Sequence, residues 1–144
     1  MKNHPAQRLL GYLKTLKSTV SEIDVNRQIF KEGTKASQVA FHASQSANFF
    51  LRVRISGGEF PRDKDSELTS DHDVSEINKS IDLAIQATQD LIDKDLDLNE
   101  KLKEEINMGD FVIDSVGGGL IFVTAHTSEH LAQLVMLHDA NPSF

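Results

Sequence analysis

The sequence predicts an all-α protein folded as a four-helix bundle. Three observations support this: apolar residues recur at three- and four-residue intervals in long segments, strand-like alternation is nearly absent, and turn signals separate the periodic segments. Packing four amphipathic helices side by side buries the apolar stripe of each. With 144 residues, no internal repeat and no low-complexity tract, a single domain over residues 1–144 is expected.

The first helix is predicted over residues 4–31. Its apolar residues have the spacing that places them on one side of a helix. Pro5 suits the first turn of that helix, and Gly33 suits its end. The expected apolar stripe consists of Leu9, Leu13, Leu16, Val20, Ile23 and Phe30.

A second helix is predicted over residues 35–55, because Ser56-Gly57-Gly58 forms a stop signal after it. Large apolar residues crowd several of its faces, so its stripe is less clear than that of the first helix. His42 is expected to lie on the inward-facing line. That line is expected to run through Val39, His42, Phe49 and Val53, with Ser46 between them.

The segment from Glu59 to His72 is charged, contains Pro61 and lacks periodicity, which predicts a loop. A loop of this length is more often functional or lid-like than a simple connector. Asp73-Val-Ser-Glu76 then matches a capping box that opens a third helix. The stripe of this helix is expected to consist of Val74, Ile77, Ile81, Ile85, Thr88 and Ile92.

Residues 93–110 are mostly Asp, Glu, Lys and Asn, and both short helical turns and extended chain fit them. Phe111-Val-Ile113 fits a short extended piece. The fourth helix is predicted to be capped by Asp114 or Ser115 and to run to about residue 139. Because this helix is apolar around most of its circumference, it is expected to be central to the bundle or buried against a second subunit.

The composition excludes several classes of function. A net charge of −7 argues against nucleic-acid binding, which depends on Lys and Arg, and disfavours docking on anionic membranes. The chain has no cysteine, which excludes disulfides, thiolate metal sites and a cysteine nucleophile. No segment approaches the roughly 20 apolar residues of a membrane span, and the N-terminus lacks the apolar core of a signal peptide. A cytoplasmic protein is expected.

The clearest chemical signal is the pair His126 and His130, which lies within the apolar run from Leu120 to Leu137. Residues four apart lie one above the other on a helix, a spacing at which two imidazoles can reach one ion. Burying both rings without a shared partner would be costly. His42 on the second helix would supply a third imidazole. Three protein ligands with an open position are typical of a catalytic metal site rather than a structural one.

Other interpretations fit the sequence less well. A zincin requires Glu directly after the first histidine, where this chain has Thr127. A di-iron bundle requires Glu-x-x-His on paired helices, a motif that this chain lacks. A haem with two imidazole ligands would leave one of the three histidines unexplained. Gly117-Gly118-Gly119 lacks the Lys-Ser/Thr of a phosphate loop, so a flexible helix start or close packing is expected there. No role is expected for His4 or His72, and His138, two turns beyond His130, could face the core but is too far along the helix to share the ion.

Polar residues near the three histidines are candidates to support them, because a ligating histidine usually donates its other N–H to a partner. Gln45 and Gln133 follow His42 and His130 by three residues, which is about one helical turn. Glu129 is a candidate catalytic base, and a solvated surface position is the alternative for it.

The segments Val39-Ala-Phe-His42-Ala-Ser-Gln45 and His126-x-x-x-His130-x-Ala-Gln133 resemble those of the DinB/YfiT-like family of metalloenzymes, the DinB superfamily. The resemblance covers most of the chain in order and spacing, and these two segments are its specific part. The family usually has Gly where this chain has Ala132.

The resemblance implies a bundle of up-down-down-up connectivity and frequent homodimers. It also implies that His42, His126 and His130 bind one divalent metal ion, nickel or zinc, with iron or manganese as alternatives. Some similar proteins are thiol-dependent transferases or isomerases that act with bacillithiol, mycothiol or glutathione. The family name refers to induction by DNA damage and not to DNA binding.

Three functions follow from these expectations. A thiol-dependent S-transferase would use the ion to stabilise the thiolate of a low-molecular-weight thiol that attacks a small electrophile. A metal-dependent hydrolase would use the ion to lower the pKa of bound water, with Glu129 or another carboxylate as base. A structural or interaction bundle would carry a vestigial metal site. The first is preferred, and the sequence names neither the thiol nor the electrophile.

Overall fold

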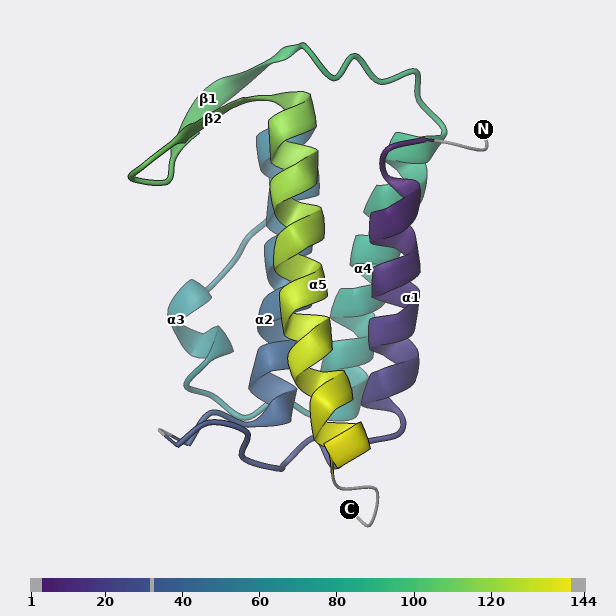
Figure 1. Cartoon of the computed structure of the whole chain (residues 1–144), viewed down its shortest axis with the longest axis vertical. Helices are drawn as coiled ribbons and strands as arrows, with labels where there is room; N and C mark the ends of the chain where they lie inside the picture. Colours follow the sequence, from purple (N-terminus) through teal and green to yellow (C-terminus); the bar gives the residue numbers. More distant parts are fainter. Residues whose placement is uncertain (1–3, 32, 141–144) are drawn as a thin grey trace.

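The structure, a computed structural model, describes residues 4–31 and 33–140, with side chains as far as Leu137. This part of the chain is mostly helical and carries one small two-stranded sheet (Figure 1). The helical class predicted from the sequence is confirmed to that extent, and the sheet is an addition to it. In chain order the elements are α1 (Gln7–Val20), α2 (Ala36–Phe49), the π-helix η1 (Phe50–Ile55), α3 (Lys64–Glu67), α4 (Val74–Ile92), β1 (Lys101–Asn107), β2 (Val112–Ser115) and α5 (Val116–Ala140).

The longer helices α1, α2, α4 and α5 lie side by side, and α1 and α2 each pack against both α4 and α5. α1 and α5 run in one direction, and α2 and α4 run in the opposite one (Figure 1). α3 lies outside these helices and contacts α2, while β2 contacts α5. The neighbouring pair α2 and α5, with α3 beside it, carries the histidines discussed below.

The first helix ends at Val20, well before the end that the hydrophobic pattern predicts. Beyond it, the Asp24 side chain accepts a hydrogen bond from the backbone N–H of Asn26, a local bond that competes with helix formation. Ile23 and Phe30 nevertheless pack against the core from this irregular segment. The helical spacing after Val20 therefore reflects burial rather than a continued helix.

The predicted second helix is present over its full length, as α2 followed by η1. Its inward face agrees with the predicted one at Val39 and Ser46, which are buried, and differs at Phe49 and Val53. Phe49 and Val53 are only half-buried. Small residues form most of the buried face instead. This face includes Ala36, Ala40, Ala43, Ala47 and, in η1, Leu51.

Three glycines of the described chain, Gly33, Gly57 and Gly109, adopt the left-handed backbone conformation that other residues rarely adopt. Gly57, with φ of +74°, follows η1 and confirms the predicted stop signal. Gly33, with φ of +96°, does not end a helix as predicted. It lies in a turn where its N–H donates to the carbonyl of Phe30, ahead of α2.

α4 begins at the predicted cap, because the Asp73 side chain accepts a 2.8 Å hydrogen bond from the backbone N–H of Glu76. The reciprocal half of the capping box is not formed. The Glu76 carboxylate instead lies 2.7 Å from Nδ1 of His72. Ile77 is fully buried as expected, whereas Val74 is exposed because it lies in the first turn, on the solvent side.

Residues 93–110, for which the sequence allowed either helical turns or extended chain, contribute the first strand of a β-hairpin. β1 and β2 pair antiparallel, with Ile106 opposite Ile113 and a register irregularity between Lys101 and Ile106. Most of its side chains are exposed, so neither a helical nor a strand period dominates the sequence. Leu102 and Ile113 are its buried residues, and they form a small cluster with the first residue of α5.

The glycine run at the start of α5 serves close packing, one of the two expected roles. A Cβ atom on Gly117 would lie 2.9 Å from the carbonyl oxygen of Leu98, and one on Gly118 would lie 3.2 Å from the Ile113 side chain. Ser115 is the cap, since its hydroxyl oxygen accepts a hydrogen bond from the N–H of Gly118.

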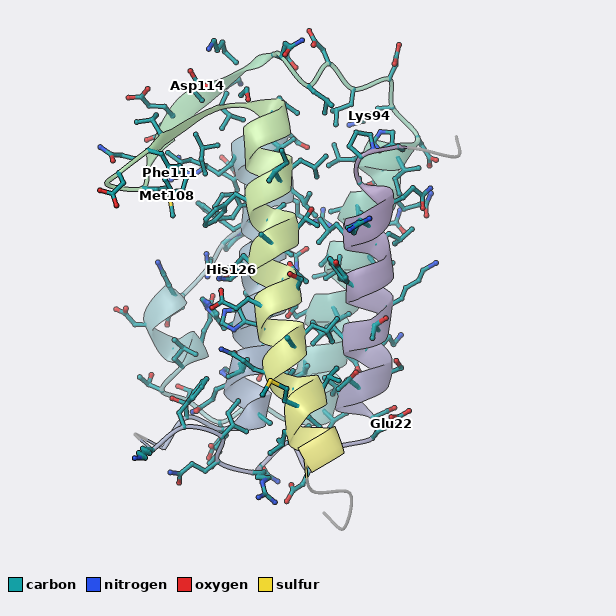
Figure 2. All side chains as sticks on the ribbon, in the orientation of Figure 1. Glu22, Lys94, Met108, Phe111, Asp114 and His126 are labelled. Atoms are coloured by element: carbon teal, nitrogen blue, oxygen red, sulfur yellow. The ribbon has the colours of Figure 1, made fainter. Side chains whose placement is uncertain are left out.

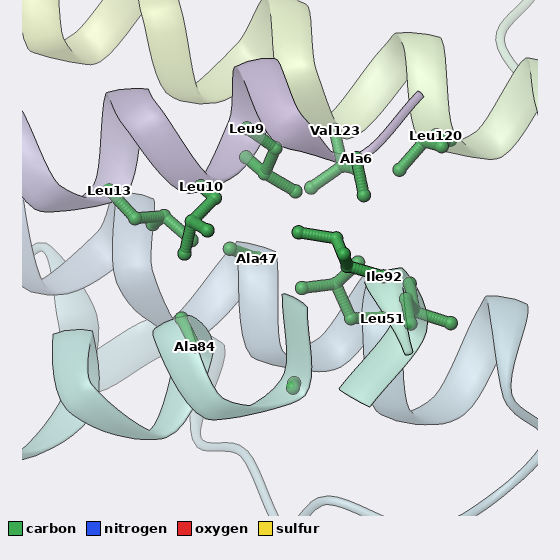
Figure 3. Packing of buried hydrophobic residues seen from close by; sticks show 12 residues of the cluster. Ala6, Leu9, Leu10, Leu13, Ala47, Leu51, Ala84, Ile92, Leu120 and Val123 are labelled. Atoms are coloured by element: carbon green, nitrogen blue, oxygen red, sulfur yellow. The ribbon is translucent and has the colours of Figure 1, made fainter. Parts of the chain in front are cut away.

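Two main hydrophobic clusters follow one another along the helices. Figure 3 shows the first, in which Leu9 of α1 and Val123 of α5 take part. Leu131 of α5 belongs to the second. The turn of α5 that carries His126 and His130 therefore lies between the two clusters. Within the described chain, every helix is too short or too polar to cross a membrane.

Candidate metal centre

Three histidines that are far apart in the sequence meet between α2 and α5. One ligand atom from each of His42, His126 and His130 can be chosen so that all three lie within 4.8 Å of one another. The ring centroid of His42 is 5.2 Å from that of His126 and 5.1 Å from that of His130. The centroids of His126 and His130 are 4.6 Å apart. This group can hold a metal ion.

The local structure of α5 directs its two histidines toward this point. Thr127, between them in the sequence, is fully buried, and its hydroxyl donates to the carbonyl of Val123. With Thr127 facing the core, His126 and His130 lie on an adjoining, half-buried face. Figure 2 shows His126 on the side of α5 toward α3. The helical spacing of four residues then brings the two rings together.

The hydrogen bonds of two rings fix which nitrogen is free to bind an ion. Nδ1 of His42 lies 2.9 Å from a carboxylate oxygen of Glu67, and Nδ1 of His130 lies 2.9 Å from Oε1 of Gln133. Both partners accept, so both Nδ1 atoms carry the proton. The Nε2 lone pairs of His42 and His130 are therefore free for a metal, which is the usual arrangement of a ligating histidine.

The size and number of these donors fit a divalent ion with an open position. Zinc–nitrogen bonds are about 2.0–2.1 Å, so three nitrogens on one tetrahedral ion lie roughly 3.3 Å apart. The ligand atoms lie within 4.8 Å of one another, so they would have to come closer together to reach that spacing. Among the described residues, the group contains three side chains and no fourth ligand. A fourth position would remain for water or substrate.

Burial favours the neutral, metal-binding form of the two α5 histidines, His126 and His130. It lowers the pKa of His126 from 6.5 to about 4, and the positive charges of His130, His42, Arg62 and Lys64 act in the same direction. Burial also lowers the pKa of His130, although the Gln133 hydrogen bond and the Glu129 charge oppose this. Both rings are thus neutral at pH 7, and a neutral imidazole is the form that binds metals.

Lowering the pH from 7 to 5 is expected to destabilise the metal-free protein through His126. Between the unfolded value of 6.5 and the folded value of about 4, the unfolded chain binds more protons, so stability falls as the pH falls. After discounting for the solvent that the half-buried ring still contacts, the loss is about 1 kcal/mol. Thermal denaturation with a chelator present measures it, and His126→Gln should show a shallower pH dependence. An unchanged slope in that variant would refute the assignment to His126.

Gln45 does not take the predicted supporting position, and Glu129 takes the solvated position that was the alternative to a catalytic base. Gln45 does not bond to His42; its Oε1 is buried and has no hydrogen-bond partner among the described residues. Glu129 is exposed, and its carboxylate forms no hydrogen bond or ion pair within the described chain. Its negative charge raises the pKa of His130. Gln133, in contrast, bonds to His130 as expected.

Glu67 is the site residue that the sequence did not reveal. It lies in the segment predicted as a charged loop, yet it is fully buried and bonds to His42, 25 residues earlier in the chain. Burial by itself would raise the pKa of Glu67, but hydrogen bonds from Arg62 and His42 outweigh this and hold the pKa below its ordinary value. Nothing in the sequence distinguishes Glu67 from the exposed acids around it.

His4 and His72 do not join the centre. His4 is buried, and its Nδ1 accepts a hydrogen bond from the backbone N–H of Ala6. His72 is also buried and stacks on Phe41 with centroids 4.0 Å apart. The side chain of His138 lies outside the described residues.

Comparison of the chain with family models, with curated proteins and with solved structures gives no match. The three-histidine centre is thus the feature of the described chain that bears most directly on function.

Proposed function

We propose that the chain is a divalent-metal-dependent enzyme similar to the DinB/YfiT-like family, folded as a four-helix bundle of up-down-down-up connectivity. The opposed directions of the α1/α5 and α2/α4 pairs support the proposed connectivity. The observation that carries the proposed function is the convergence of His42, His126 and His130 from two of these helices. Nickel or zinc suits three neutral imidazoles best, and iron or manganese is the alternative.

The proposed reaction is transfer of a low-molecular-weight thiol to a small electrophile. A bound divalent ion would supply Lewis acidity, which lowers the pKa of a coordinated thiol and increases the concentration of its nucleophilic thiolate. The protein holds its ligands in place: Glu67 and Gln133 accept the Nδ1 protons of His42 and His130. Phe122, whose ring lies 6.1 Å from that of His126 at an interplanar angle of 23°, provides an apolar wall beside the centre.

The surroundings of the centre favour thiol transfer over hydrolysis. A hydrolase needs a general base within hydrogen-bond reach of the attacking water. Glu129 is exposed and forms no hydrogen bond to the histidines of the centre, and the carboxylate of Glu67 is already bonded to Arg62 and His42. The ligand group itself consists of three histidines and, among the described residues, includes no carboxylate. Hydrolysis with Glu129 as base remains the second candidate, and a bundle with a vestigial metal site is the third.

An activity screen separates the three candidates. The metal-loaded protein is incubated with a small electrophile, with and without each of several low-molecular-weight thiols, and loss of the electrophile is followed. A transferase consumes electrophile only with thiol and metal, and Glu129→Gln retains most of that activity. Turnover without thiol, abolished in Glu129→Gln, would indicate the hydrolase. A protein that binds no metal, or that loses it without losing any activity or partner, would contradict both enzymatic candidates.

We also propose a homodimer that uses the exposed apolar face of α5. Ile121 is 73% exposed and Met136 is 67% exposed, which is unusual for large apolar side chains. A groove of about 470 Å³ lies beside Ile121, between α1 and α5. Covering this face with the same face of a second copy would bury both side chains.

At micromolar concentration, light scattering is expected to give the mass of two chains. Ile121→Glu should shift the protein to the monomer, because it places a charge in the apolar interface. Leu83→Glu is the matched control, since Leu83 is 41% exposed on α4 and should leave the dimer intact. A wild-type monomer, or a dimer that Ile121→Glu does not weaken, would rule out this interface.

A further inference from the structure

Glu67 combines complete burial with a charged side chain in a very short helix. Its side chain is 1% exposed, although α3 is a single helical turn at the protein surface. A carboxylate is almost never buried in this way unless it is paired. Its contacts therefore indicate what holds it there.

The first partner of Glu67 is Arg62. The guanidinium donates to both carboxylate oxygens, through Nε at 2.6 Å and through a terminal nitrogen at 2.8 Å. The same terminal nitrogen donates to the hydroxyl of Ser46 on α2 at 2.9 Å. The guanidinium also lies 5.6 Å from the centre of the Phe49 ring. This bidentate pair fixes the orientation of the carboxylate and compensates its charge.

The second partner is the metal-centre residue His42. Its Nδ1–H donates to Oε1 of Glu67 at 2.9 Å. A carboxylate that accepts the outer N–H of a ligating histidine fixes the tautomer and the ring orientation and makes the other nitrogen a stronger donor. Glu67 is the carboxylate that occupies this position in the described chain.

The same residue connects the centre to the segment 59–72, which contains α3. Nε2 of His72 donates to the backbone carbonyl of Glu67 at 3.1 Å, and Lys35 bonds to Asp71 at 2.7 Å. Arg62 reaches α2 through Ser46. Among these contacts, the Glu67–His42 hydrogen bond is the one that links the segment directly to a proposed metal ligand.

We infer that Glu67 is a positioning residue that orients His42 for metal binding, and that through it metal binding stabilises segment 59–72 on α2. The inference rests on the proposed function, because it assumes that His42 binds an ion. Arg62 acts one step further out by holding the carboxylate. The segment is thus a part of the metal centre rather than a simple connector.

Co²⁺ is the probe for the test, because its visible spectrum reports coordination and its unpaired electrons shift the N–H signals of bound histidines. The main variant is Arg62→Met/Glu67→Met, which removes the acceptor without leaving a buried unpaired charge. Glu67→Gln keeps an acceptor but removes the charge, so it serves as the conservative variant if the double variant does not fold. Asp65→Asn, an exposed acid on the same short helix, is the matched control.

The affinity for Co²⁺ is expected to fall about 10- to 100-fold in the double variant, less in Glu67→Gln and not at all in Asp65→Asn. The His42 N–H signal should exchange with solvent faster as the acceptor weakens. Hydrogen exchange across residues 59–72 should slow when Co²⁺ is added to the wild type. In the double variant at saturating Co²⁺, that slowing should be absent.

A folded double variant, or Glu67→Gln, with wild-type affinity and a wild-type His42 N–H signal would overturn the positioning role. Equal metal-dependent protection of residues 59–72 in the wild type and the variants would overturn the coupling. These outcomes differ from failure of the proposed function, in which the wild-type protein itself would not bind Co²⁺ through its histidines.

Discussion

Replacing any one of His42, His126 and His130 by alanine is expected to abolish stoichiometric metal binding. The three ligand atoms lie within 4.8 Å of one another, and no described side chain can substitute for a missing one. Two imidazoles retain too few bonds to the ion. The affinity should therefore fall by more than about 100-fold, the upper end of the loss when only an outer partner is removed.

Elemental analysis and Co²⁺ titration of the three purified variants measure this effect. Ser128→Ala is the matched control, because Ser128 lies between His126 and His130 on α5 and its hydroxyl donates to the backbone of Ala125. It should bind metal like the wild type. Full metal content in any one histidine variant would remove that residue from the centre.

Removing the metal with a strong chelator is expected to abolish activity while the protein stays helical. The two hydrophobic clusters on either side of the centre contain fully buried residues such as Leu13 and Ile81, and neither needs the ion to pack. Each buried aliphatic side chain contributes about 1.5–3 kcal/mol. A metal present at 100 times its Kd adds about 2.7 kcal/mol, so the Tm should fall by roughly 5–10 °C on its removal.

Circular dichroism with and without chelator, recorded alongside the activity assay, tests this expectation. His126→Ala serves as the control, since its melting temperature should not respond to the chelator. Unfolding at room temperature on chelation would show that the ion is structural, and the open catalytic centre would then lose its main support.

The helical part of the fold follows from apolar periodicity because each long helix buries one side. The same signal misplaced the end of α1, since Ile23 and Phe30 keep the helical spacing while packing from an irregular segment. Apolar periodicity also did not predict the hairpin, because most side chains of β1 and β2 are exposed and only a few are buried. Periodicity reports which residues are buried and not which backbone carries them.

The histidines of the candidate site could be predicted from the sequence. A spacing of four residues places His126 and His130 on one helix face, and His42 lies on the predicted inward line of the second helix. The hydrogen-bond partner of His42 could not be predicted in this way. Gln45 was expected from its position one turn away, whereas the actual acceptor, Glu67, reaches His42 across a tertiary contact. Such a contact depends on how α3 folds back onto α2, which no local pattern encodes. The exposure of Glu129 likewise depends on the rotation of α5 about its axis.

The close contacts of Gly117 and Gly118 give the hairpin a mechanical role. Ser115 of β2 leads directly into α5, and Leu98 packs against Gly117 in the first turn of this helix. The first turn of α5 is therefore held in contact with the chain that precedes the helix. A helix is stiff along its axis, and His126 lies about 13 Å farther along it. The contact with Leu98 thus helps to fix the axial position of α5, and with it the positions of His126 and His130 relative to His42. A methyl group added at Gly117 would lie 2.9 Å from the carbonyl oxygen of Leu98, so either Leu98 or the start of α5 would have to move.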